Sequence, residues 1–165
     1  ISLVVGQYFL LKPNKGIGTL FGSFENILPR EVSVVGAGVA GREAISKGID
    51  SGAHVNVLDI SEQKLKDLSK VFGNENISYI HSTPESISDA VSRSDLVIGS
   101  VYVVGKEAPK VITKEMLKEM KPGSVLVDIS IDQGGCIETS KPTTHDVNCK
   151  GQKMGGHYSS ECNSQ

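Results

Sequence analysis

Residues Val32 to Gly41, VSVVGAGVAG, give the strongest indication of the fold, because they join a strand pattern to a glycine motif and a helix start. Four residues typical of a buried strand are followed by three glycines in the spacing G-x-G-x-x-G, which is typical of a strand–turn–helix unit that binds a dinucleotide. The first glycine permits a tight turn, the second allows a pyrophosphate to approach the backbone, and the third lets the helix pack on the strand. A glycine-rich turn that serves packing alone is the alternative. The motif predicts a cofactor site at Gly36, Gly38, Val39, Ala40 and Gly41.

Short apolar runs continue to alternate with longer helical stretches along the chain. Strands are predicted at 32–35, 54–59, 77–80, 95–100 and 124–129. Helices are predicted after the glycine motif and after the capping residues Ser61, Thr83 and Thr113, and the last of these helices is expected to carry Met120. Strands that are apolar throughout are covered on both faces, and helices between them imply parallel crossovers. The prediction is an α/β fold, a doubly wound parallel sheet of the Rossmann type in three α/β/α layers.

Asp59 ends the second predicted strand, 18 residues after Gly41, close to the spacing of about 20 residues at which dinucleotide sites place an acid. Its carboxylate can accept hydrogen bonds from both hydroxyls of an adenosine ribose. It would also repel a 2′-phosphate, and Ile60 and Ser61 follow it where an NADP site usually offers Arg. Lys64, one helical turn further on, would soften that preference. The sequence therefore favours NAD over NADP.

Two further segments follow predicted strands at the edge where open α/β sheets bind ligands. Residues 99–105, GSVYVVG, form a candidate wall for the ribose and nicotinamide, with an ordinary loop as the alternative. Residues 128–136, DISIDQGGC, carry Asp128 and Asp132, and an acid there can orient a water or an amine beside the nicotinamide. A turn or capping carboxylate is the alternative for Asp132. Cys136 is interpreted as a buried bystander thiol, and the histidines lack metal-ligand spacing, so no metal is expected.

Composition narrows the classes of protein further. The 165 residues suffice for one domain with a proper core, and 17 basic against 19 acidic residues supply no broad cationic surface for nucleic acid. Three cysteines without C-x-x-C spacing favour a reducing compartment over a disulfide framework. The apolar run of residues 1–11 is about half the length of a membrane span and is interpreted as a helix cut from a longer protein. No membrane association or targeting signal is predicted, so a cytoplasmic location is expected.

Several stretches, taken together, resemble the NAD-binding domain of the alanine dehydrogenases. They are VVGAGVAG at 34–41, VLD at 57–59, SDLVIGSV at 94–101, GKEAPKVIT at 105–113 and MKPGSVLVDISIDQGGCIETSKPTTHD at 120–146. The resemblance covers about residues 1–146. The related nicotinamide nucleotide transhydrogenases share the glycine motif and the segment like GKEAPKVIT, but differ over 131–146.

The resemblance implies oxidative deamination of L-alanine to pyruvate and ammonia, with hydride transfer to NAD, in a parent protein that is a homo-oligomer. It implies that Asp132 is the catalytic acid and that Asp59 binds the ribose. Lys64 would lie beside the adenosine ribose and Ser82 near the adenine. The remaining residues that it places along the cofactor are Ile60, Val101, Tyr102 and Ile129.

The resemblance and the composition together divide the chain into three predicted segments. Residues 1–30 are expected to be a linking helix and loop from a missing N-terminal substrate lobe, and residues 31–145 the Rossmann domain. Residues 146–165 form an atypical tail without Leu, Ile or Phe, which is predicted to be disordered. The chain is thus expected to be a dinucleotide-binding fragment, inactive by itself. The alternatives are a transhydrogenase-like NAD(H)-binding module that docks on a membrane partner, and a non-functional remnant.

Overall fold

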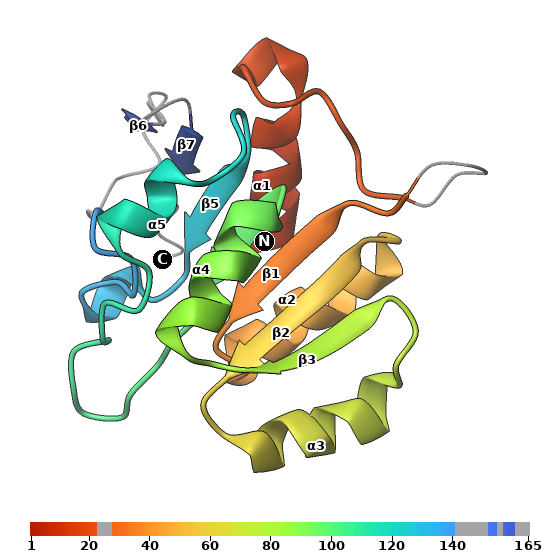
Figure 1. Ribbon diagram of the computed structural model, residues 1–165, viewed down its shortest axis with the longest axis vertical. Coiled ribbons are helices and arrows are strands. Elements are labelled where there is room, and N and C mark those ends of the chain that lie inside the picture. Colours follow the sequence, from red (N-terminus) through yellow and green to blue (C-terminus); the bar gives the residue numbers. More distant parts are fainter. Residues whose placement is uncertain (23–27, 141–151, 155–156, 161–165) are drawn as a thin grey trace.

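A parallel sheet forms the centre of the computed structural model (Figure 1), which describes residues 1–22, 28–140, 152–154 and 157–160. The sheet order is β3-β2-β1-β4-β5-β7-β6, and the strands from β3 to β7 in that order pair in parallel. The order reverses between β1 and β4, as expected for a doubly wound sheet. The strands are β1 Glu31–Val35, β2 His54–Asp59, β3 Ile77–His81, β4 Leu96–Gly99, β5 Val125–Asp128, β6 Gln152–Met154 and β7 His157–Ser160.

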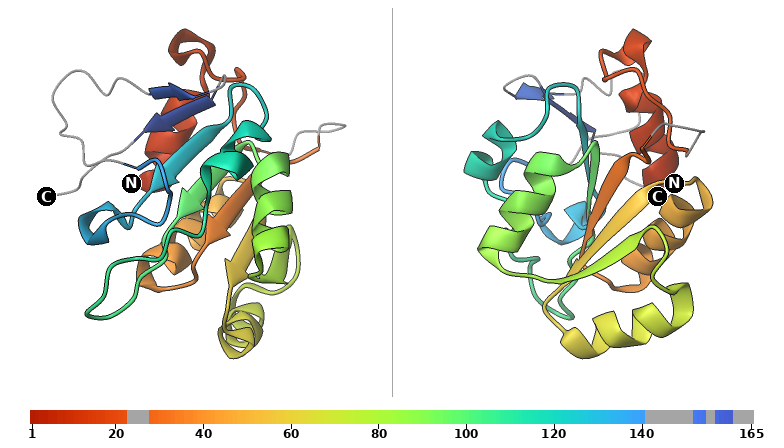
Figure 2. Two further views of the ribbon diagram at one scale, coloured as in Figure 1. Left: turned by 60° about the vertical axis from the view of Figure 1, so that its left-hand side comes forward. Right: turned by 45° about the vertical axis from the view of Figure 1, so that its right-hand side comes forward.

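Helices cover both faces of the sheet, which Figure 2 shows in its right-hand view as two separate layers. One apolar cluster joins the strands to α1, α2 and α3, and a second joins them to α4 and α5. The Rossmann-type, three-layer fold predicted from the alternation of strands and helices is confirmed. The helices are α1 Ser2–Leu10, α2 Val39–Asp50, α3 Glu62–Phe72, α4 Pro84–Arg93 and α5 Lys114–Lys118, with the 3₁₀ turns η1 Lys12–Asn14 and η2 Ile131–Gln133.

Three helices begin at the hydroxyl capping residues predicted from the sequence. At the start of α3, Ser61 Oγ accepts from the Lys64 N–H at 3.3 Å. At the start of α4, Thr83 directly precedes Pro84 and forms a reciprocal capping box with Ser86. The predicted third capped helix is shorter than expected, because α5 ends at Lys118 while Met120 lies beyond it. Pro122 disfavours helical backbone at the residue before it and therefore limits the helix. Met120 still packs into the core, at 3% exposure.

The two strands in the tail differ from the sequence prediction. Disorder was expected over 146–165, but β6 and β7 lie in that range, and the other tail residues lie outside those that the structure describes. The register pairs β7 with β5 in parallel and β6 with β7 in antiparallel orientation. Strand pairing uses backbone N–H and C=O groups, so a segment poor in large apolar side chains can still extend an open sheet edge.

The N-terminal helix α1 confirms the helix predicted over residues 1–11 and packs on the sheet with Leu3 and Leu10 buried. Its other face leaves Ile1, Val4 and Tyr8 exposed. No helix among the described ranges is long and apolar enough to cross a membrane.

Candidate functional site

The carboxyl ends of the central strands meet at one level of the sheet. The register pairs Val35 with Leu58 on one side and with Gly99 on the other, and Gly99 with Asp128. The loops that follow these residues therefore lie side by side. They flank the point between β1 and β4 where the strand order reverses, which is where open α/β sheets bind ligands.

Gly38 leaves open space at the start of α2. A Cβ built on Gly38 would meet no heavy atom within 4 Å, and its backbone is extended, at φ −72° and ψ −167°. Gly38 is the N-cap of α2 and provides no side-chain cap, so the first N–H groups of the helix keep no side-chain partner from this residue. Unpaired N–H groups at a helix start attract anions. Together these features fit a pyrophosphate lying against Gly38, Val39 and Ala40.

The other two glycines of the motif are required by packing against the exit of β4. Gly36 has φ +99°, and a Cβ there would lie 2.6 Å from the Ser100 carbonyl oxygen. A Cβ on Gly41 would collide with the Gly36 carbonyl and would lie 2.7 Å from Ser100 Oγ. Ser100 Oγ in turn donates to the Gly36 carbonyl at 2.5 Å. Packing thus explains why Gly36 and Gly41 are glycines. Of the three glycines in the motif, Gly38 is the one that faces open space.

Asp59 holds the glycine loop and the start of α3 together. Its Oδ2 accepts from the Ala37 N–H at 2.9 Å, and its Oδ1 accepts from the Ser61 N–H at 2.8 Å. The side chain is only 6% exposed. Two carboxylate oxygens offer about four acceptor positions, so this arrangement leaves capacity for a ribose hydroxyl. The sequence predicted the position of this acid but not its two backbone partners.

The residues assigned to the adenosine half gather around Asp59. Lys64 Nζ lies 3.7 Å from Asp59 Oδ2 and is 57% exposed, so its charge reaches the same carboxylate. The Ser82 N–H donates to the Asp59 carbonyl at 3.0 Å. Ile60 is 79% exposed and presents an apolar side chain next to the acid. The structure thus brings Ile60, Lys64 and Ser82 to one place.

The residues assigned to the nicotinamide half line the other side of the reversal point. Val101 and Tyr102 follow β4, with Val101 half-buried and Tyr102 62% exposed. Ile129 follows β5, and its N–H donates to the Gly99 carbonyl at 2.8 Å. A hollow of about 1010 Å³ begins at this edge and runs along α2 as far as Ser51, between α2, α1 and the segment at the end of β5. Ala40, Ile129 and Asp132 all line it.

The two acids of the segment after β5 differ in environment. Asp128 is 2% exposed and accepts from the Ser130 N–H at 2.9 Å, the Ile137 N–H at 3.1 Å and Ser140 Oγ at 2.6 Å. Asp132 is exposed on η2, and within the described part of the chain its carboxylate makes no hydrogen bond. Asp128 therefore holds the loop, and Asp132 is the carboxylate that remains available to a ligand.

Cys136 lies beneath this loop as a buried thiol. It is 0% exposed, and its Sγ donates to Asp128 Oδ1 at 3.5 Å. Burial, together with the negative charge of Asp128, raises the pKa of the Cys136 thiol to about 12. The thiol is therefore protonated at neutral pH and is not a nucleophile there.

The roles of two residues at this site were not predicted from the sequence. Ser100 bridges β4 to the glycine loop, and its position directly after a central strand could have suggested this role. Lys110 donates to the carbonyl oxygens of Gly134 and Gly135, which lie 24 and 25 residues further along the chain. No local pattern around Lys110 signals that contact, because it depends on how two distant loops pack.

Known proteins share much of this sequence. The family model described as "Alanine dehydrogenase/PNT, C-terminal domain" matches residues 2–160, and so extends beyond residue 146, where the resemblance read from the sequence ended. Alanine dehydrogenase of Mycolicibacterium smegmatis is 45% identical over 146 residues, and that of Bacillus subtilis is 41% identical over 143. These matches cover 88% and 86% of this chain, but only 39% and 38% of the relatives.

Solved structures give the same result. An L-alanine dehydrogenase superposes with a TM-score of 0.89 at 35% identity, covering 97% of this chain and 44% of that protein. A transhydrogenase from Sinorhizobium meliloti superposes with a TM-score of 0.77 at 25% identity, covering 98% of this chain and 44% of that one. The chain spans about two fifths of the length of the relatives that it matches. On the family match over nearly its whole length, this chain belongs to the alanine dehydrogenase/PNT C-terminal domain family, a family of NAD(H)-binding domains.

Proposed function

We propose that this chain is the NAD-binding part of an enzyme that oxidises L-alanine to pyruvate and ammonia. The observation that supports this most directly is the exposed Asp132, which follows β5 at the sheet edge where Gly38 follows β1 and Asp59 ends β2, and which lines the hollow together with Ala40. Relatives that carry the name alanine dehydrogenase support the choice of reaction. A cytoplasmic location and a homo-oligomeric parent remain predictions alongside it.

In this proposal different residues bind different parts of the cofactor. The pyrophosphate lies on the N–H groups at the start of α2, in the space that a side chain at Gly38 would fill. Asp59 binds the adenosine ribose, with Lys64 beside it and with Ile60 and Ser82 toward the adenine. Val101, Tyr102, Ile129 and Asp132 border the nicotinamide end.

The reaction converts L-alanine, water and NAD⁺ into pyruvate, ammonium, NADH and a proton. NAD⁺ supplies the hydride acceptor when it is bound. Asp132 orients the water that replaces the amino group and takes up a proton at its carboxylate. The neighbouring Asp128 does not compete for this role, because backbone and hydroxyl donors occupy both of its oxygens. The chain spans only about two fifths of the length of its relatives, so turnover is assigned to a whole protein of their length.

The cofactor assignment is tested by calorimetric titration of the 165-residue chain with NADH and NADPH. We expect saturable NADH binding and much weaker NADPH binding, since Asp59 repels a 2′-phosphate. Asp59→Asn keeps an acceptor for one backbone N–H but removes the charge, so NADPH should gain roughly tenfold relative to NADH. Lys64→Gln should have the opposite effect on the cofactor ratio, because loss of the Lys64 ammonium should weaken NADPH binding relative to NADH. An unchanged cofactor ratio in Asp59→Asn would show that another group selects the ribose.

The proposed reaction is tested in a chimaera in which residues 1–140 replace the matching segment of the Mycolicibacterium smegmatis alanine dehydrogenase. We expect alanine-dependent formation of NADH. Asp132→Asn in the chimaera should lower kcat by about a hundredfold or more, because general acid–base groups contribute about that much, while NADH affinity falls by about tenfold at most. Equal losses in turnover and NADH affinity would identify Asp132 as a structural residue.

A transhydrogenase-like module is the second candidate, favoured by the superposition on the Sinorhizobium meliloti transhydrogenase. It predicts NADH binding to the chain without alanine turnover in the chimaera. A non-functional remnant predicts neither NADH binding nor cooperative unfolding of the chain. The calorimetric and chimaera experiments therefore separate the three functions.

A further inference from the structure

The loop that carries Asp132 is attached to the protein on two sides. On one side, the Asp128 carboxylate at the end of β5 accepts from Ser130, Ile137 and Ser140. On the other side, the segment between β4 and α5 crosses the loop. There the Ala108 N–H donates to the Gln133 carbonyl at 2.8 Å, and the Val111 N–H donates to the Cys136 carbonyl at 2.9 Å.

Lys110 adds a charged contact to this second attachment. Its Nζ donates to the Gly134 carbonyl and, at 2.8 Å, to the Gly135 carbonyl. Both glycines have positive φ, 87° and 75°, a conformation that side chains disfavour. Hydrogen bonds from a charged donor are about twice as strong as neutral ones. One ammonium group thus holds two successive peptide carbonyls directly after Asp132 and Gln133.

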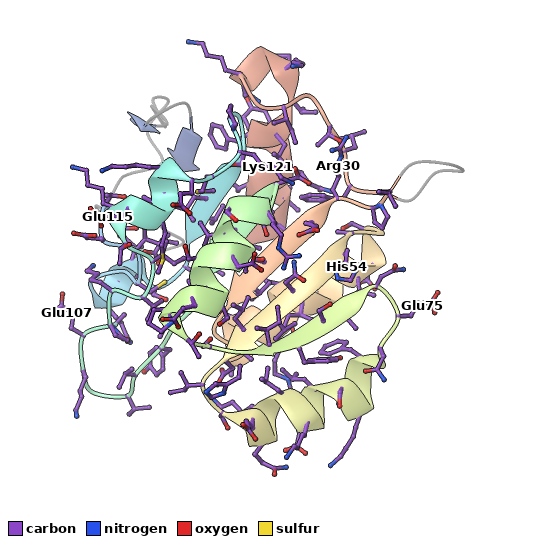
Figure 3. The ribbon with its side chains drawn as sticks, viewed as in Figure 1. Arg30, His54, Glu75, Glu107, Glu115 and Lys121 are labelled. Atoms are coloured by element: carbon purple, nitrogen blue, oxygen red, sulfur yellow. The ribbon has the colours of Figure 1, made fainter. Side chains whose placement is uncertain are left out.

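The Glu107 side chain packs against the same loop at Gly134. A Cβ on Gly134 would lie 2.5 Å from Glu107 Oε1 and 2.7 Å from its Cγ, so the backbone of the loop passes directly under this side chain. Figure 3 shows Glu107 beside the ribbon of η2. The segment 107–112 therefore covers the loop closely, and Lys110 is its charged anchor.

We propose that Lys110 is a positioning residue, whose ammonium holds the Gly134 and Gly135 carbonyls and thereby sets the direction of the Asp132 carboxylate toward the nicotinamide half of the cofactor. The inference rests on the proposed function, because it needs a nicotinamide at Asp132. It assigns Lys110 no contact with the cofactor itself. Its effect should therefore fall on the nicotinamide half of the ligand and spare the adenosine half, which binds at Gly38 and Asp59 on the other side of the reversal point.

The test compares NADH with ADP-ribose, which lacks the nicotinamide, in titrations of the 165-residue chain. Lys110→Met keeps the length of the side chain but removes the donor, and we expect NADH to bind roughly tenfold more weakly, with ADP-ribose affinity within about twofold of wild type. Lys110→Arg retains a cationic donor and should restore most of the NADH affinity. Lys118→Met, which removes an exposed lysine on α5, is the matched control and should change neither affinity.

Two results would overturn the inference. Unchanged NADH affinity in Lys110→Met would show that the loop keeps its position without the ammonium. Equal weakening of NADH and ADP-ribose would show a general structural role. Failure of the proposed function is a different result, because then either the wild-type chain binds neither NADH nor ADP-ribose, or it binds NADH while the chimaera shows no alanine turnover.

Discussion

Gly38→Val should abolish NADH binding while leaving the protein folded. The Cβ position of Gly38 meets no heavy atom within 4 Å, and its φ of −72° suits any residue, so the folded chain accommodates a larger side chain. The same space is where the pyrophosphate should lie, and a valine there would keep it away from the N–H groups of α2. We expect NADH affinity to fall at least about a hundredfold, or about 2.7 kcal/mol, with unchanged circular dichroism and thermal unfolding.

A matched variant of the same motif separates binding from folding. Gly36→Ala introduces a Cβ at φ +99°, 2.6 Å from the Ser100 carbonyl oxygen, so it should destabilise the fold directly. Gly38→Ala should give a smaller loss of NADH affinity than Gly38→Val and no loss of stability. Undiminished NADH binding by Gly38→Val would contradict the assignment of the cofactor to this edge.

Asp128→Ala should strongly lower the stability of the fold. Its carboxylate is 2% exposed and accepts from two backbone N–H groups and from Ser140 Oγ. Its removal leaves buried donors without an acceptor, at about 1–3 kcal/mol each, so we expect a loss of about 3–5 kcal/mol in the free energy of unfolding. A typical domain has only about 5–15 kcal/mol. Urea unfolding followed by circular dichroism measures the change.

The neighbouring acid provides the control for this prediction. Asp132 is exposed and makes no hydrogen bond within the described residues, so Asp132→Asn should change the free energy of unfolding by less than about 0.5 kcal/mol. A stability loss in Asp132→Asn that equals the loss in Asp128→Ala would mean that both acids support the loop. The contrast between the two carboxylates, four residues apart, would then disappear.

The fold was predictable because its signals are local. The capping residues Ser61 and Thr83, the alternation of apolar runs with helical stretches, and the spacing of Gly36, Gly38 and Gly41 each operate within a few residues. The same periodicity places Asp59 at the end of one strand and Asp132 shortly after another, because parallel strands bring their carboxyl ends to one edge. The tail strands and the early end of α5 were missed, since neither depends on apolar periodicity.

The roles within the site depend on contacts between distant segments. Asp128 and Asp132 look equivalent in the sequence, yet packing of residues 130–140 against β5 buries one and leaves the other exposed. The sequence predicts Asp59 as a ribose ligand, but in the fold its carboxylate also accepts a hydrogen bond from the N–H of Ala37, 22 residues earlier. Lys110 carries no local signal at all, because its acceptors come from another loop.

Local sequence signals were enough to predict the doubly wound sheet, the dinucleotide motif and the edge of the sheet at which the candidate acids lie, because backbone sterics, capping and hydrophobic periodicity act over short distances along the chain. Three features emerge only from the packing of distant segments: the open space at Gly38, the lack of hydrogen bonds to the Asp132 carboxylate among the described residues, and the contact of Lys110 with the loop. Burial and hydrogen-bond partners are set by segments that meet in space after long separations in sequence, so no local pattern encodes them.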